Sequence, residues 1–262
     1  MSFLTTISPT KDESFIETSA RFMFLFPAIG TFIGFLAGLY SFLTFNILSF
    51  LFSLVSGFFF GSQGVFIAFL AKLFSSAMTL AFLFVLTGLQ HMDGLIDVGN
   101  ALSSIKASAE EKMLIAHTWA VTRTGAFMAI LVSCFTLLFM FLIKPEATIP
   151  SLIVAETSAK LAMVTCAWQG SSLQRGLGSI FIDSMKNKHH LYSIALLISL
   201  IVGMVFFALQ GALAITSGVI VGGVMIFLAK KIFGGVTGDI MGATNEIARM
   251  VTLFVLMLVL AY

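Results

Sequence analysis

The composition of this 262-residue chain is that of a membrane protein, since 59% of its residues are hydrophobic and only 10% are charged, against about 25% charged residues in soluble globular proteins. A soluble globular domain is therefore excluded, and the net charge of +2 is too small to indicate a nucleic-acid partner. We expect an all-α, polytopic transmembrane bundle that forms a single integral membrane domain over residues 1–262.

Apolar runs of about 20 residues are long enough to cross a bilayer as a helix, and they predict seven spans. The predicted spans are 22–44, 64–87, 124–143, 151–169, 190–209, 212–230 and 246–262. The apolar segment 46–60 is shorter and has Gly57, Gly61 and Gly64 near its end. It is compatible with a re-entrant segment, an interfacial segment or an eighth span.

Lysine and arginine residues concentrate in alternate connections between the predicted spans. The rich connections are 88–123, 170–189 and 230–249, with Lys106, Lys112, Arg123, Arg175, Lys186, Lys188, Lys230, Lys231 and Arg249. The intervening connections carry only Lys144 or no basic residue. Because cytoplasmic loops carry the excess of basic residues, we predict a multi-pass protein of the cytoplasmic membrane. The N-terminal segment 1–21 and these three connections then face the cytoplasm.

The connection 88–123 contains a predicted amphipathic helix. Ser108 and Glu111 have the spacing of a capping box. Apolar residues then recur at helical spacing, at Met113, Ala116, Trp119 and Ala120. We expect this helix to lie on the cytoplasmic surface of the membrane.

The stretch "TGLQHMDGLIDVGN" at 87–100 places acidic residues at the mouth of an apolar span. Asp93, Asp97 and Asn100 stand at i, i+4 and i+7, so they share one helical face with His91 nearby. Two carboxylates so close repel each other unless a cation lies between them, and their hard oxygen ligands suit Mg²⁺. The alternative is a solvated helix end at the membrane edge.

A second acidic stretch, "FGGVTGDIMGATNEIARM" at 233–250, opens with a glycine-rich turn. Its candidate residues are Gly235, Thr237, Gly238, Asp239, Asn245 and Glu246. The glycines allow backbone N–H groups to approach an anion closely, whereas the alternative is a simple break between packed helices. Because both acidic stretches are predicted on the same membrane face, we favour one shared metal site that holds substrate phosphates.

Cationic residues add to this prediction. Arg175 lies in "QGSSLQRGLGSIFID" at 169–183, where it would bind phosphate oxygens or serve as a positive-inside anchor. Glu156 and Lys160 form an i,i+4 pair inside a predicted span, where they either neutralise each other or present Lys160 to the site. Lys72 lies in the outer half of its span and is expected to extend outward.

With these stretches identified, the chain resembles the cobalamin synthase family, also called adenosylcobinamide-GDP ribazoletransferases. The resemblance extends over "FLTTISP" at 3–9, "FPAIGTFIG" at 26–34, "TGLQHMDGLID" at 87–97, "LQRGLGSIF" at 173–181 and "GGVTGDIMGATNE" at 234–246. It implies an integral membrane transferase of cobalamin biosynthesis that requires Mg²⁺. A ribose hydroxyl of α-ribazole or its 5′-phosphate would attack adenosylcobinamide-GDP, and GMP would leave.

The resemblance also implies roles for the candidate residues. Catalysis and metal binding are expected of Asp93, Asp97, Asp239 and Glu246, one of which is a candidate base. Substrate and phosphate binding are expected of His91, Asn100, Lys160, Arg175, Gly235, Thr237, Gly238 and Asn245. Beyond its substrates, the expected partner is the lipid bilayer, and a homo-oligomer is compatible with the sequence.

The chain departs from the family pattern at two positions. The family commonly has a third acid where this chain has Asn100, and commonly an Asp shortly before Gly125, where this chain reads "AVTRTG". Either change would alter metal affinity or substrate preference. The main acidic clusters remain intact.

Two other functions are compatible with acidic residues beside apolar spans. A phosphatidyltransferase that uses CDP-alcohols also has aspartate pairs at membrane-edge helices, but here Asp97 follows Gly94 too early for that family's pattern. A cation-coupled transporter would place its ionisable residues near the bilayer midplane. Here the acids gather at one end of the spans, which favours an enzyme facing the cytosol.

Overall fold

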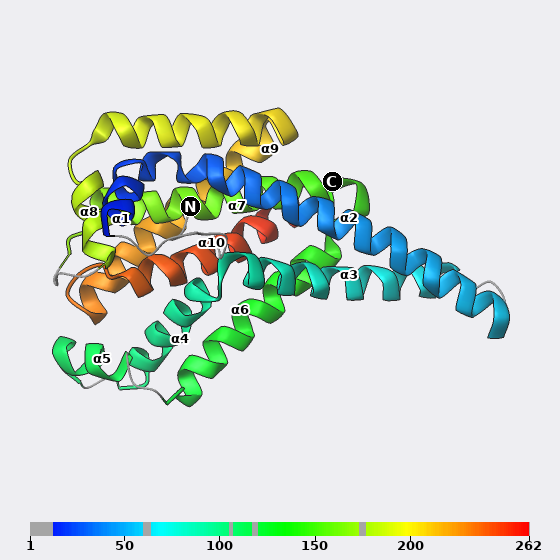
Figure 1. Cartoon of the computed structure of the whole chain (residues 1–262), viewed down its shortest axis with the longest axis horizontal. Helices are drawn as coiled ribbons and strands as arrows, with labels where there is room; N and C mark the ends of the chain where they lie inside the picture. The colour runs from blue at the N-terminus through cyan, green and yellow to red at the C-terminus, as the bar shows by residue number, and fades with distance from the viewer. Residues whose placement is uncertain (1–12, 60–63, 105–106, 117–119, 173–176, 262) are drawn as a thin grey trace.

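The protein is a bundle of helices. A computed structural model describes residues 13–59, 64–104, 107–116, 120–172 and 177–261, and contains no strand within these ranges (Figure 1). The helices are α1 (Glu13–Arg21), η1 (Met23–Leu25), α2 (Phe26–Phe59), α3 (Gly64–Thr87), α4 (Gln90–Leu102), α5 (Ala109–Ala116), α6 (Arg123–Leu142), η2 (Pro145–Ala147), α7 (Thr148–Gln169), α8 (Leu177–Met185), α9 (His189–Ile232) and α10 (Gly238–Val259).

Six helices in the described part of the chain are long and apolar enough to cross a membrane. One of them, α9, has 44 residues and would be about 66 Å long if straight. It breaks at Phe207 and at Ala208, whose φ is 48°, and folds back so that a Cβ atom on Gly203 would lie 2.7 Å from the carbonyl oxygen of Gly211. Its two arms, visible in Figure 1, match the predicted spans 190–209 and 212–230, so the prediction of about seven spans is confirmed.

Two predicted boundaries were wrong. The first span continues as one helix, α2, through the segment 46–60 up to Phe59, so this segment is neither re-entrant nor a separate span. Its polar Asn46 donates a hydrogen bond to the carbonyl of Phe42 (2.7 Å) within the same helix and requires no break. The last span begins at Gly238 rather than at 246, so its acidic residues lie on the helix itself.

Helix α7 is the centre of the bundle, and small residues of its neighbours pack directly on it. Gly30 and Gly34 of α2 have no room for a Cβ atom beside the α7 backbone, and Gly222 of α9 would place one 2.9 Å from the carbonyl oxygen of Ala162. Helices in membranes associate closely at such small residues. Aromatic stacking between Trp168 and Tyr192, with ring centroids 3.9 Å apart, adds to the contact of α7 with α9.

The helices that carry the candidate residues gather at one end of the bundle. The hydroxyl of Ser184 in α8 donates to the carbonyl of Ala20 in α1 (2.7 Å), and Gly178 at the start of α8 contacts Gly238 at the start of α10. Figure 1 shows α1, α4, α5 and α8 at this end, whereas α2 and α3 extend farthest in the opposite direction. The predicted grouping of the acidic stretches at one end is therefore what the fold produces.

Candidate active site

A tight turn sets the direction of the first acidic helix. After α3 ends at Thr87, Gly88 and Leu89 both adopt positive φ angles, 73° and 60°. This conformation suits glycine and is unfavourable for leucine. The turn starts α4, whose first turn contains the exposed Asp93; Asp97, one turn later, is half-buried. The two carboxylates therefore lie one turn apart on α4, as the helical spacing predicted.

The second acidic stretch begins α10 with a capped N-terminus. Gly234 has a φ of 79°, and the backbone N–H of Val236 donates to the carbonyl of Ser171 (2.9 Å). Thr237 is the N-cap residue: its hydroxyl accepts a hydrogen bond from the N–H of Ile240 (3.3 Å) and donates to Asp239 (3.4 Å). Asp239 thus lies in the first turn of a 22-residue helix, where the helix dipole favours negative charge.

Helices α4 and α10 pack through glycines, which brings the two acidic stretches together. A Cβ atom on Gly94 would lie 2.6 Å from the carbonyl oxygen of Asp239, and one on Gly242 would lie 3.2 Å from the Cα of His91. Only residues without a side chain permit such an approach. Asp93, beside Gly94 in sequence, is therefore held next to the N-terminus of α10.

Helix α8 forms the third side of this region. A Cβ atom on Gly178 would lie 2.6 Å from the backbone nitrogen of Gly238. The predicted phosphate ligand Arg175 belongs to the segment 173–176, outside the described residues.

Arg249, Glu156 and Glu246 form a buried set of ion pairs between α7 and α10. Arg249 is fully buried and donates hydrogen bonds to Glu156 on α7 and to Glu246 on its own helix; the second contact is 2.5 Å from Nη1 to Oε2. Burying an ion without a partner is costly, so the arginine and the two glutamates are kept together.

Lys160 and Asn245 complete this buried set. The ammonium group of Lys160 donates to Oδ1 of Asn245 (2.7 Å), and the Asn245 amide donates to Oε1 of Glu246 (3.1 Å). With Glu156, Glu246, Lys160 and Arg249 charged, two negative and two positive groups balance. Lys160 therefore faces Asn245 on α10 while it also interacts electrostatically with Glu156 on its own helix, so it takes part in both predicted contacts.

His91 lies beside the buried set, on the helix that carries Asp93 and Asp97. Its Nδ1 lies 4.0 Å from Oε1 of Glu246, and its buried ring nitrogens have no hydrogen-bond partner among the described residues. Burial, together with the positive charges of Lys160 and Arg249, holds the pKa of His91 well below its usual range. Both effects favour the neutral imidazole, and His91 precedes Asp93 by two residues on α4.

Arg249 is the residue that the sequence interpretation misplaced. It was counted among the basic residues of a cytoplasmic connection, whereas it is fully buried between α7 and α10. Two signals were available: Glu246 and Arg249 have i,i+3 spacing, and a glutamate inside a span, Glu156, requires a cationic partner.

The side chain of Asn100 on α4 forms hydrogen bonds to the last residue of α5 and to the residue just before α6. Its Oδ1 accepts hydrogen bonds from both the N–H and the hydroxyl of Thr122 (each 2.9 Å), and its amide donates to the carbonyl of Ala116 (3.4 Å). A Cβ atom on Gly125 would collide with the same Oδ1. The Asn100 side chain is therefore engaged by the segment before Gly125 in which the second departure from the family pattern falls.

The predicted capping box at the start of α5 is confirmed. The N–H of Ser108 donates to Glu111 (2.8 Å), and the N–H of Glu111 donates to the Ser108 hydroxyl (3.2 Å). The helix in the described residues is short, ending at Ala116, and its Leu114 is exposed.

The donor chemistry of the exposed carboxylates fits Mg²⁺ when a phosphate substrate supplies the remaining ligands. The described residues contain no group of three or more acidic, histidine or cysteine side chains close enough to hold a metal alone. Mg²⁺ is commonly bound by one or two carboxylates together with substrate phosphates. Asp93, Asp97 and Asp239 provide such oxygens, whereas Glu246 is engaged by Arg249.

Comparisons with known proteins agree on one family. The sequence model for Cobalamin-5-phosphate synthase matches residues 1–257. The adenosylcobinamide-GDP ribazoletransferase of Methanocella arvoryzae is 35% identical over 199 residues, covering 70% of this chain and 74% of the relative. Those of Methanococcoides burtonii and Thermococcus onnurineus are 29% and 30% identical, covering 72% of this chain and 72% and 78% of the relatives. No solved structure matches significantly.

Proposed function

The chain belongs to the cobalamin-5-phosphate synthase family, and from this membership we propose that it joins adenosylcobinamide-GDP to α-ribazole or α-ribazole 5′-phosphate, giving adenosylcobalamin or its 5′-phosphate and GMP. Its relatives from Methanocella arvoryzae and Methanococcoides burtonii are named adenosylcobinamide-GDP ribazoletransferases. The observation that carries the proposal is the contact between Gly94 and Asp239, which unites the two acidic stretches.

The proposed reaction is a displacement at phosphorus. A ribose hydroxyl of the ribazole attacks the phosphorus on the cobinamide side of the diphosphate, and a new P–O bond forms. The bond from this phosphorus to the bridging oxygen breaks, and that oxygen leaves on GMP. The hydroxyl proton passes to a base, for which a carboxylate of the site is our candidate. Negative charge accumulates on the transferring and leaving oxygens, so catalysis depends on positioning and electrostatic stabilisation.

The carboxylates of Asp93, Asp97 and Asp239 are proposed to hold a magnesium ion together with the diphosphate. When bound, Mg²⁺ would offset the charge of the diphosphate and of the departing GMP. The turn at Gly235, Thr237 and Gly238 leads into the N-terminus of α10, whose dipole favours an anion. The diphosphate is therefore proposed to bind at this end of α10, beside Asp239.

The buried residues are proposed to fix the geometry of this site. Arg249 orients Glu246, and Glu246 lies beside His91 on α4. Because Glu246 is bonded to Arg249 and lies beside His91, its proposed contribution is to support His91 and the α4–α10 contact. A direct bond from Glu246 to the metal would require it to leave Arg249.

We propose that this end of the bundle faces the cytoplasm in the cell membrane. The basic residues of the connections support this orientation, and nucleotide substrates are cytosolic. The described part of the chain at this end includes Lys112, Lys186 and Lys230.

The proposal is tested by product analysis with the protein in liposomes. With Mg²⁺, adenosylcobinamide-GDP and α-ribazole 5′-phosphate, GMP and a lower-ligand-bearing corrinoid should appear in equal amounts. A phosphatidyltransferase would release CMP from a CDP-alcohol and leave the corrinoid unchanged, and a transporter would release no nucleotide. GMP release that continues without the ribazole acceptor would indicate hydrolysis and contradict transfer.

A further inference from the structure

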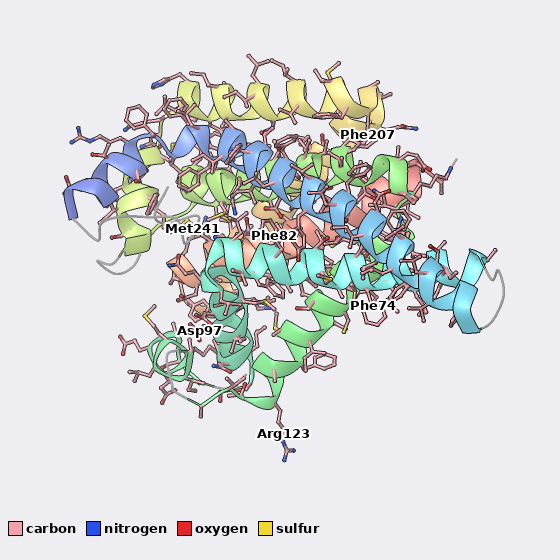
Figure 2. All side chains as sticks on the ribbon, turned by 45° about the vertical axis from the view of Figure 1, so that its right-hand side comes forward. Phe74, Phe82, Asp97, Arg123, Phe207 and Met241 are labelled. Atoms are coloured by element: carbon pink, nitrogen blue, oxygen red, sulfur yellow. The ribbon has the colours of Figure 1, made fainter. Side chains whose placement is uncertain are left out.

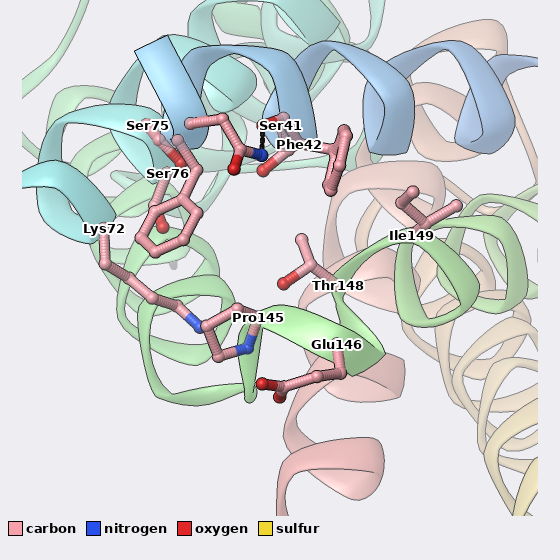
Figure 3. Close-up of a pocket in the computed structure, with 11 residues that line it drawn as sticks. Ser41, Phe42, Lys72, Ser75, Ser76, Pro145, Glu146, Thr148 and Ile149 are labelled. Atoms are coloured by element: carbon pink, nitrogen blue, oxygen red, sulfur yellow. Dashed lines mark hydrogen bonds between the residues drawn. The ribbon is translucent and has the colours of Figure 1, made fainter. Parts of the chain in front are cut away.

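A second polar site lies away from the acidic stretches, in a cavity of about 300 Å³ between α2, α3 and the start of α7 (Figure 3). Lys72, Ser75 and Ser76 of α3 line it, and their i, i+3, i+4 spacing places them on one helical face. Glu146 and Thr148 line the opposite wall. Charged and hydroxyl groups from three helices thus surround a cavity bordered by apolar bundle surface.

The cavity presents a cation and an anion together. Lys72 donates one hydrogen bond to the carbonyl of Ile143, which leaves two of its three N–H donors for a ligand. Glu146 interacts electrostatically with Lys72 and is exposed at the cavity. A ligand with one negative and one positive group matches this pair, whereas a free phosphate ion would face the Glu146 carboxylate without compensation.

Two serine residues add hydroxyl groups to the lining of the cavity. Ser75 and Ser76 both line it and are 3% and 4% exposed as whole residues. Hydroxyl groups donate readily to phosphate oxygens, so beside Lys72 they form the anion-binding part of the cavity.

The cavity and the acidic stretches lie at opposite ends of α7. Thr148 begins this helix at the cavity, and Gly170, just after its last residue, contacts the turn before α10. The 22 residues of α7 correspond to about 33 Å, close to the roughly 30 Å thickness of a bilayer core. The cavity is therefore at the level of the other membrane interface.

The open side of the cavity is apolar. Phe42 and Phe45 of α2 line it, and Phe42 is 50% exposed. Such a surface on membrane-spanning helices faces acyl chains. A ligand that enters here would carry an apolar tail beside its polar group.

We propose that this cavity binds the headgroup of a zwitterionic phospholipid, with the phosphate at Lys72, Ser75 and Ser76 and the amine at Glu146. The shared chemistry is a phosphate ester that carries an ammonium group. A volume of about 300 Å³ is at the small end of ligand cavities and too small for a corrinoid. The lipid would join the α2–α3 pair to the start of α7, far from the proposed reaction.

The test is native mass spectrometry of the full chain in detergent micelles with equal amounts of phosphatidylethanolamine and phosphatidylglycerol. We expect retained phosphatidylethanolamine to exceed phosphatidylglycerol at least about fivefold. Lys72→Met and Glu146→Gln should each abolish this preference. Lys144→Met is the matched control, because Lys144 is exposed two residues from Glu146 and does not line the cavity.

The Ser75→Ala, Ser76→Ala double variant keeps the proposal falsifiable if Lys72→Met does not fold, since it removes only the hydroxyl groups and should also lower lipid retention. Soluble phosphoethanolamine distinguishes the two sources of this chemistry: retention of it without retention of the lipid would overturn the assignment to a lipid. Equal retention of both lipids by the unchanged chain, or an undiminished preference in the Glu146→Gln variant, would also overturn the proposal.

Discussion

Gly94 and Asp239 are in backbone contact, so that a single Cβ atom on Gly94 would come within 2.6 Å of the Asp239 carbonyl oxygen. The two residues are far apart in sequence, and each belongs to an acidic stretch at the start of a helix. Figure 2 labels Asp97 on α4 and Met241 on α10. The contact between α4 and α10 brings the two acidic stretches together into one candidate site.

Replacing Gly94 should therefore damage activity through geometry alone. In Gly94→Ala the added methyl group would collide with the backbone of Asp239, which cannot change rotamer as a side chain can. Helix α4 must therefore move away from α10, at a cost of about 1–3 kcal/mol in stability. We expect at least a tenfold lower rate of GMP release. Gly223→Ala is the control, because that helical glycine has nothing within 4 Å of an added Cβ. Equal losses in both variants would mean that the α4–α10 contact has no special role.

The carboxylates themselves are tested by amide substitution. Asp93→Asn and Asp239→Asn keep the side-chain shape and remove the charge, so each should lower turnover by about a hundredfold or more, while the protein inserts and purifies normally. Asp183→Asn is a suitable control, because Asp183 is an exposed carboxylate of α8 at the same end of the bundle. Near-normal turnover in either test variant is the result that would reject the shared site.

The buried ion pairs should be needed for stability. Arg249→Met would leave Glu156 and Glu246 as buried charges without their arginine, at an expected cost of about 3–5 kcal/mol in the free energy of unfolding. Combining Arg249→Met with Glu156→Gln should recover part of this loss, because one of the unpaired charges is removed. Thermal unfolding in detergent measures both variants. If the combined variant is less stable than Arg249→Met alone, unpaired charge is not the cause.

The orientation can be tested with single cysteines in a chain whose native Cys134 and Cys166 are replaced by alanine. A membrane-impermeant thiol reagent should label Cys at Ser104 only from the cytoplasmic side, because Ser104 follows α4. Cys at Ala147, or at Leu209 beside the break in α9, should be labelled only from the outside. Labelling of Ser104 and Leu209 from the same side would contradict the hairpin in α9 and the count of crossings.

The sequence predicted the helical class, the number of crossings and the positions of both acidic stretches, because apolar runs and helical spacing determine these features directly. It also predicted the cap formed by Ser108 and Glu111. The break in α9 was expected at 210–211 and occurs at Phe207 and Ala208. Neither residue is a glycine or proline, so tertiary packing and not local preference fixes the position of the break.

The buried half of the site was harder to predict. A count of basic residues near the ends of spans cannot tell whether Arg249 faces water or the interior, since this depends on how α7 and α10 face each other. The substrate-binding role of Asn100 stays a prediction, and the hydrogen bond that its side chain accepts from Thr122 could not be read from the sequence. Both outcomes depend on contacts between segments far apart in sequence, for which helical spacing gives no information.

The most direct test of the central claim, that α4 and α10 form one cation-dependent site, is Mn²⁺ binding measured by electron paramagnetic resonance with adenosylcobinamide-GDP present. Mn²⁺ accepts the same oxygen ligands as Mg²⁺ and its signal reports binding without turnover. The account predicts that the unchanged protein binds Mn²⁺, and that Asp93→Asn and Asp239→Asn, on different helices, each weaken binding at least about tenfold. Mn²⁺ binding of unchanged affinity in both variants would contradict it.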